Sequence, residues 1–124
     1  MILEVEQRLA KAERLLAQAD GLSADEIPET VVHLAYYAML HAAAAVLLVS
    51  TGRVPKTHGA TIGQFSQLMK DRGDTARLLS RAFNWAEGLR LASDYAHGET
   101  PSADDVRRLR ATARNFVAYC RSLV

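Results

Sequence analysis

Apolar residues recur at intervals of three and four along most of the chain, a spacing that predicts amphipathic α-helices. The first such segment covers residues 2–20, and Gly21 provides a natural stop after it. Its apolar positions are Val5, Leu9, Ala12, Leu16 and Ala19. A polar connector is predicted for residues 23–27.

The second predicted helix, residues 28–51, is apolar almost all round. Pro28 suits its first turn, where the missing N–H is harmless, and Gly52 ends it. A helix without a polar face is buried on several sides. This helix is therefore expected either at the centre of the fold or against a partner subunit.

Three further helices complete the pattern. A short one is predicted over residues 60–70 and is ended by Gly73. A fourth begins near Asp74 or Thr75, either of which is a possible N-cap, and runs to His97. The apolar stripe of this fourth helix consists of Leu78, Ala82, Trp85, Leu89, Ala92 and Ala96. The last helix is capped by Ser102. Its core positions are Val106, Leu109, Ala113, Phe116, Cys120 and Val124.

The whole pattern predicts an all-α fold in a single domain, residues 1–124. With short loops between the helices, the architecture is an up-and-down four-helix bundle with one short extra helix. The formal net charge of +1 means that any anion-binding surface must be local.

Composition indicates a soluble cytoplasmic protein. The single cysteine, Cys120, fits a reducing compartment, and no charged-then-apolar leader opens the chain. The longest apolar stretch, residues 34–49, is interrupted by His41 and is shorter than the ~20 residues that a bilayer requires. No membrane association is expected.

Arg90, Asp94 and His97 form the most suggestive polar group, because their spacing of i, i+4, i+7 places them on one stripe of a regular helix. Arg90 offers a fork of donors for a phosphate, and His97 can exchange a proton near neutral pH. A regular helix separates these two by about 10 Å along its axis, enough to bracket a phosphodiester. Asp94 would then hold Arg90. The alternative is an ion pair beside a histidine at a helix C-terminus.

Two other polar groups are candidates for supporting roles. Tyr37 and His41 are i, i+4 neighbours, and we interpret them as a buried polar pair that could also support a site on the fourth helix. Arg53, Lys56 and His58 lie in a basic loop that is either solvated or contacts an anion at the mouth of a site.

The last helix carries a row of arginines, and two interpretations stay open for it: a solvent face or a patch that binds phosphate backbones. The row consists of Arg107, Arg110, Arg114 and Arg121. The four histidines are scattered and form no pattern typical of metal ligands, so neither a metal site nor a cofactor is predicted.

Several separated motifs together resemble the HEPN domain, in particular its small stand-alone bacterial and archaeal branch. They are the segment Ala-Tyr-Tyr-Ala-Met-Leu-His-Ala-Ala at residues 35–43, Lys-Thr-His at 56–58, Leu-Arg at 89–90 and Ser-Asp-Tyr at 93–95. The resemblance covers essentially the whole chain in order.

The resemblance implies a dimeric bundle of four helices with a short extra one. Arg90 and His97, with six residues between them, match the family's arginine–histidine motif. In active members this motif belongs to a metal-independent ribonuclease, in which two subunits together cleave RNA by 2′-hydroxyl attack. The resemblance thus implies a homodimeric toxin of a toxin–antitoxin pair, with a nucleotidyltransferase as antitoxin. Tyr95, beside the motif, is grouped with the supporting residues.

One departure from the family pattern keeps the enzyme class open. Active members commonly have a polar residue directly after the arginine, where this chain has Leu91. The alternative is a non-catalytic HEPN module that binds RNA, a nucleotide or a nucleotidyltransferase partner. A purely structural dimerisation domain is a third hypothesis.

Overall fold

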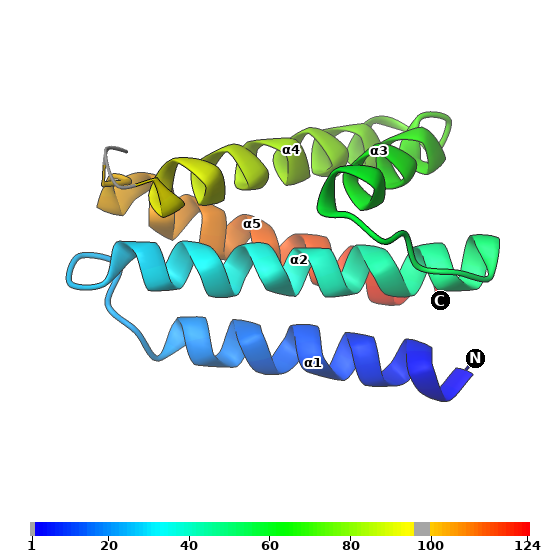
Figure 1. The fold of residues 1–124 in the computed structure, drawn as a ribbon, viewed down its shortest axis with the longest axis horizontal. Helices are drawn as coiled ribbons and strands as arrows, with labels where there is room; N and C mark the ends of the chain where they lie inside the picture. The colour runs from blue at the N-terminus through cyan, green and yellow to red at the C-terminus, as the bar shows by residue number, and fades with distance from the viewer. Residues whose placement is uncertain (1, 96–99) are drawn as a thin grey trace.

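The computed structural model describes residues 2–95 and 100–124, and it consists of five helices joined by short connections (Figure 1). They are α1 (Ile2–Asp20), α2 (Pro28–Thr51), α3 (His58–Met69), α4 (Asp74–Asp94) and α5 (Ala103–Ser122). No strand occurs in the described residues, so the all-α bundle predicted from the sequence is confirmed.

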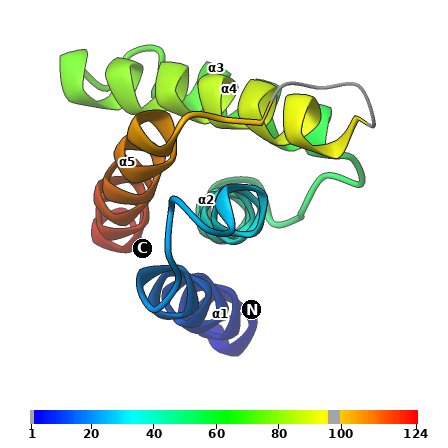
Figure 2. The same cartoon turned by 90° about the vertical axis from the view of Figure 1, so that its left-hand side faces the viewer.

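Helix α2 lies at the centre of the fold, which is the first of the two positions that its sequence allowed. It contacts each of the other four helices, and most of its residues are buried. Its length and apolar composition would suffice to cross a membrane, but most of that stretch is buried inside the protein, as in the core helix of a bundle. Figure 1 shows α1 lying antiparallel to α2, and Figure 2 shows α4 crossing α2 obliquely on the other side.

The helix ends follow local chemistry. Gly52 ends α2 in the left-handed region, with φ of 82°. The side chain of Thr57 accepts a hydrogen bond from the backbone N–H of Ala60, so α3 begins two residues earlier than predicted. Gly73, with φ of 98°, is itself the residue before α4, so neither Asp74 nor Thr75 caps that helix as predicted. The predicted cap of α5 is confirmed: the hydroxyl of Ser102 accepts a hydrogen bond from the N–H of Asp105.

The predicted apolar stripe of α4 was wrong. The buried residues of this helix are Ala76, Ser80, Phe83 and Ala86. Phe83 joins an aromatic core, with its ring centre 5.0 Å from that of Phe116. Ser80 is tolerated in this stripe because its hydroxyl lies 2.5 Å from that of Ser66 on α3.

Of the predicted stripe, Trp85 and Leu89 are half-buried and pack against the outside of the core, whereas Ala96 lies outside the described residues. Leu78 is 59% exposed, and the half-buried Trp85 is covered by the guanidinium of Arg108, 4.7 Å from the ring centre. At the end of α5, Val124 is also exposed rather than in the core.

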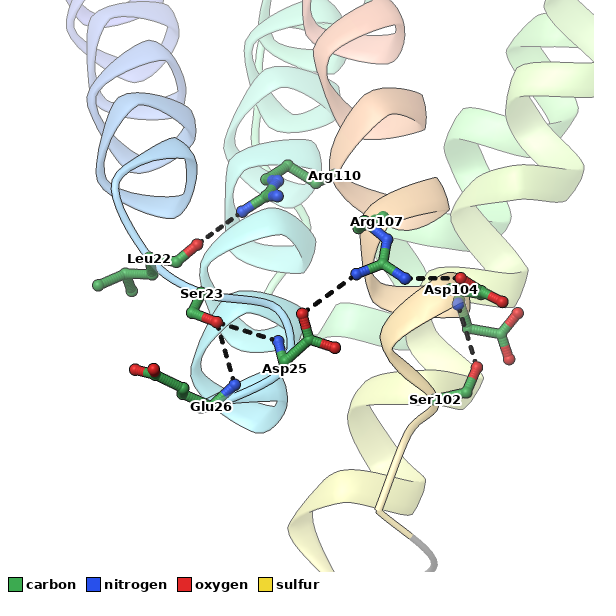
Figure 3. A network of polar contacts seen from close by, with 9 residues as sticks. Leu22, Ser23, Asp25, Glu26, Ser102, Asp104, Arg107 and Arg110 are labelled. Carbon is green, nitrogen blue, oxygen red and sulfur yellow. Dashed lines mark hydrogen bonds and ion pairs between the residues drawn. The ribbon is translucent and has the colours of Figure 1, made fainter.

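The arginines of α5 fasten this helix to α1 and to the α1–α2 connector. Figure 3 shows Arg107 between Asp25 and Asp104, and Arg110 reaching the carbonyl oxygen of Leu22, 2.9 Å away. Further along, Arg114 pairs with Asp20, and Arg121 pairs with Glu6 and Glu13. We call these contacts the α1–α5 seam. These arginines are engaged with oxygens of the protein at a largely exposed surface, which favours the interpretation of this row as a solvent face.

Candidate functional site

The candidate site is centred on Arg90, whose side chain is only 14% exposed. Continuing from Phe83 by steps of four and three residues leads to Glu87 and then to Arg90. Arg90 therefore lies on the side of α4 that faces α2. Its guanidinium carbon lies 4.9 Å from the ring centre of Tyr36 on α2, within the range of a cation–π contact.

Two carboxylates on α4 hold the guanidinium from either side. One terminal nitrogen of Arg90 donates to Asp94 Oδ2 at 3.0 Å, and the other donates to Glu87 Oε2 at 3.3 Å. The predicted role of Asp94 in holding Arg90 therefore has a direct structural counterpart. Burial acts to lower the pKa of Arg90, but the Glu87 carboxylate outweighs it, so the pKa is raised and the guanidinium remains charged.

Two buried polar atoms at this site have no hydrogen-bond partner among the described residues. They are Nε of Arg90 and the hydroxyl of Tyr36, a residue with no exposed surface. Burial, with the nearby Glu87 carboxylate, raises the pKa of Tyr36 far above its ordinary range, so this hydroxyl keeps its proton. Unpaired buried donors are rare in folded proteins, and each costs free energy unless a further atom accepts its hydrogen bond.

A cluster of aromatic rings adjoins Arg90. The Tyr36 ring centre is 5.8 Å from that of His58 and 5.2 Å from that of Tyr37. The Tyr37 ring in turn lies 4.4 Å from His33 and 5.5 Å from His58, between ring centres. Arg90 and His58 thus both lie within 6 Å of the Tyr36 ring centre.

The predicted pairing of Tyr37 with His41 is not present. Tyr37 contacts His33 and His58 instead, because the first residue of α3 packs over this part of α2. His41 lines a separate open cavity of about 410 Å³ with residues of α1. Burial, together with the charges of Lys11 and Arg8, lowers the pKa of His41.

The basic loop is divided by the fold. Arg53 and Lys56 line a surface cavity of about 500 Å³, whose other walls include Pro55 and Gln64. His58 belongs to α3 and lies against Tyr36 and Tyr37. The three predicted anion contacts therefore divide between this cavity and the Arg90 cluster.

His97, the predicted partner of Arg90, lies outside the described residues. Helix α4 ends at Asp94, three residues earlier than predicted, and Tyr95 continues in an extended conformation with φ of −83° and ψ of 136°. The regular helix on which the predicted separation of about 10 Å was based therefore stops at Asp94. Tyr95 is 69% exposed, and Leu91, directly after Arg90, is 39% exposed.

Tyr36 and Glu87 are the neighbours of Arg90 that the sequence analysis did not assign to the site. Glu87 precedes Arg90 by three residues on one helix, a spacing that allows an ion pair and could have revealed it. Tyr36 comes from another helix, and only the packing of α4 on α2 brings it under the guanidinium.

Fold and site together define a small all-α protein with a buried arginine held at the end of one helix. The family model of the HEPN domain matches residues 5–123, and the chain belongs to this family.

Two archaeal proteins are similar to the chain over most of its length. A "UPF0332 protein" of Archaeoglobus fulgidus is 36% identical over 124 residues, which cover 98% of this chain and 95% of that protein. A Methanocaldococcus jannaschii protein named "Putative toxin MJ0605" is 27% identical over 114 residues, which cover 92% of this chain and 84% of that protein.

Proposed function

We propose that this protein is an endoribonuclease toxin of a toxin–antitoxin pair, acting without a metal ion at a site shared across a homodimer. The observation that supports it best is the state of Arg90, a charged and nearly buried guanidinium with an unpartnered Nε. Membership of the HEPN family and the relative named as a toxin point the same way.

In this proposal Arg90 binds the scissile phosphodiester. A histidine takes the proton of the ribose 2′-hydroxyl, the 2′ oxygen forms a bond to phosphorus, and the bond from phosphorus to the 5′ oxygen breaks. The leaving 5′ oxygen takes a proton from a second acid. Arg90 stabilises the negative charge that builds up on the phosphorus oxygens, and the product carries a 2′,3′-cyclic phosphate.

Two histidines are candidates for proton transfer. His97 is the choice of the family motif, and in a dimer the two copies of it could divide the acid and base roles. His58 is favoured by its position, since it shares the Tyr36 ring with Arg90 within one chain. Tyr37 and Tyr95 are assigned supporting roles beside these groups, and Arg53 and Lys56 are assigned to contacts with the RNA backbone.

The test is cleavage of single-stranded RNA by purified protein in excess EDTA, with Arg90→Gln, His97→Ala and His58→Ala compared with the parent. The proposal expects EDTA-resistant cleavage that ends in cyclic phosphate and is lost in Arg90→Gln. Loss in one histidine variant identifies the proton-transferring residue. A parent that leaves RNA intact, or an Arg90→Gln protein as active as the parent, contradicts the proposal. A monomer in light scattering contradicts the shared site.

The second candidate is a non-catalytic module that binds RNA, a nucleotide or a nucleotidyltransferase. It is favoured by Leu91, which is apolar and partly exposed directly after Arg90, and by the two carboxylates that already occupy the guanidinium. Its signature is binding without cleavage. Copurification of a nucleotidyltransferase encoded beside this protein would identify that enzyme as its binding partner.

A further inference from the structure

The two carboxylates that hold the Arg90 guanidinium differ in their exposure to solvent. Glu87 accepts a hydrogen bond from one terminal nitrogen at 3.3 Å, and Asp94 accepts one from the other at 3.0 Å. The Glu87 side chain is 22% exposed, whereas the Asp94 side chain is 54% exposed. The remaining nitrogen of the guanidinium, Nε, is buried. The Asp94 side is therefore the more open side of the guanidinium, and a ligand that arrives from solvent meets Arg90 there.

The charges of this group, in the arrangement that the structure shows, do not favour an anion. One guanidinium and two carboxylates together have a formal net charge of −1. A phosphodiester is also negative, so it gains little from a guanidinium whose two terminal nitrogens already donate to carboxylates. Phosphate binding at Arg90 therefore requires that one of the two carboxylates leaves.

Asp94 is the carboxylate that can leave at low cost. It is the last residue of α4, and a negative charge at a helix C-terminus is disfavoured by the helix dipole. Tyr95, the next residue, is extended and exposed, so the Asp94 side chain can turn into solvent without uncovering the core. Glu87 lies about two turns further into the helix and is less exposed, so it stays on Arg90.

We propose that Asp94 is an autoinhibitory competitor for the phosphate ligand of Arg90. This inference rests on the proposed function, because it takes the RNA phosphodiester as that ligand. In the free protein the Asp94 carboxylate accepts the hydrogen bond of the terminal nitrogen. When RNA binds, this carboxylate moves into solvent, and a phosphate oxygen accepts the hydrogen bond in its place. Glu87 keeps the other terminal nitrogen and with it the orientation of the guanidinium.

The experiment measures the affinity of the protein for a fluorescent 2′-O-methyl oligoribonucleotide, which cannot be cleaved by 2′-hydroxyl attack, by fluorescence anisotropy. Asp94→Asn keeps the shape of the side chain and removes its charge. We expect this variant to bind the oligonucleotide about fivefold more tightly than the parent, the upper end of the coupling found for exposed ion pairs. Asp71→Asn is the matched control, because it removes an exposed carboxylate before the opposite end of α4, and it should bind like the parent.

A double-mutant cycle with Arg90→Gln tests whether Asp94 acts through Arg90. The gain from Asp94→Asn should disappear in the Arg90→Gln background, because the carboxylate then has no guanidinium to occupy. An equal gain in both backgrounds overturns the proposal, since it would mean that Asp94 only repels the RNA. An affinity of Asp94→Asn equal to or below that of the parent also overturns it, because Asp94 would then only position Arg90.

The parent protein gives a second measurement that does not depend on the folding of any variant. On saturation with the oligonucleotide, the carboxyl carbon resonance of Asp94 in an NMR spectrum should move to the position of a hydrated aspartate. An Asp94 resonance that does not move, or a parent that does not bind the oligonucleotide, contradicts the exchange.

Cleavage and the exchange at Arg90 fail separately in this design. A parent that leaves natural RNA intact, together with tighter binding by Asp94→Asn through Arg90, contradicts the ribonuclease and retains the autoinhibitory contact. A parent that cleaves RNA, together with an Asp94→Asn protein that binds no more tightly, contradicts the autoinhibitory contact alone.

Discussion

The buried hydroxyl of Tyr36 leads to a prediction that runs against the usual effect of core substitutions. Tyr36 has no exposed surface, and its hydroxyl has no hydrogen-bond partner among the described residues. In the unfolded chain this hydroxyl is hydrated. Tyr36→Phe removes the uncompensated group and leaves the ring in place, so we expect the variant to be more stable than the parent.

The magnitude follows from the cost of burying an unpaired polar group, about 1–3 kcal/mol. The aromatic face beneath Arg90 remains in phenylalanine, so the cation–π contact at 4.9 Å is retained. The vacated volume is that of one oxygen atom, which offsets part of the gain. We therefore expect the free energy of unfolding to rise by about 1 kcal/mol, or the Tm to rise by about 4 °C in a domain of this size.

Urea unfolding followed by circular dichroism measures this change, with a melting curve as a second reading. Tyr95→Phe is the matched control, because the Tyr95 side chain is 69% exposed and its hydroxyl stays hydrated in both states. The control should match the parent. A loss of more than about 1 kcal/mol in Tyr36→Phe would refute the reasoning, since it would mean that the hydroxyl is bonded in the folded protein, for example to Glu87 or to a trapped water.

Three further predictions concern other parts of the fold. Arg121→Gln in the α1–α5 seam should lower the free energy of unfolding by less than about 1 kcal/mol, because its ion pairs are largely exposed. The loss should be smaller at 0.5 M salt than at 0.05 M salt, because salt screens these pairs. A loss that does not depend on salt would contradict this prediction. The pKa of His41 is lowered in the folded state, so the unfolded chain binds its proton more readily and stability should decline as the pH falls below about 6.5. In urea titrations the free energy of unfolding of His41→Gln should decline less between pH 7.5 and 5.5 than that of the parent. The same decline in both proteins would contradict the role given to His41. Burial raises the pKa of the Cys120 thiol far above neutrality, so this thiol should react with a disulfide reagent only in denaturant; rapid labelling of the native protein would contradict its burial.

The helices were predictable wherever local chemistry determines them. α1 and α2 have the bounds that the apolar spacing, Pro28 and Gly52 indicated, and Ser102 caps α5 as expected. The buried face of α4 was not predictable, because Ser80 is polar and its burial depends on a hydrogen bond with Ser66 of α3.

The candidate site divides in the same way. The contact of Arg90 with Asp94 is a property of one helix, and the sequence spacing was sufficient to predict it. The contacts of Arg90 with Tyr36, and of Tyr36 with His58, depend on three helices meeting, and no spacing along the chain encodes them. The acidic partners of the α5 arginines could not be predicted either, because they lie on α1, far away in sequence. Without these partners the arginines have the pattern of a nucleic-acid-binding patch.

The α1–α5 seam also determines when the fold is completed during synthesis. Arg121 bonds to Glu13 and Glu6, residues that precede it by 108 and 115 positions. The helical pair α1–α2 can form while the chain is still growing, but its acidic side has no counter-charge until the last helix has left the ribosome. A protein truncated before residue 107 would therefore lose the ion pairs between α1 and α5 and also the apolar face of α5 that buries α2. The side chains of the Arg90 cluster come from α2, α3 and α4, but the aromatic core beneath them includes Phe116 of α5, so it too is complete only when α5 packs.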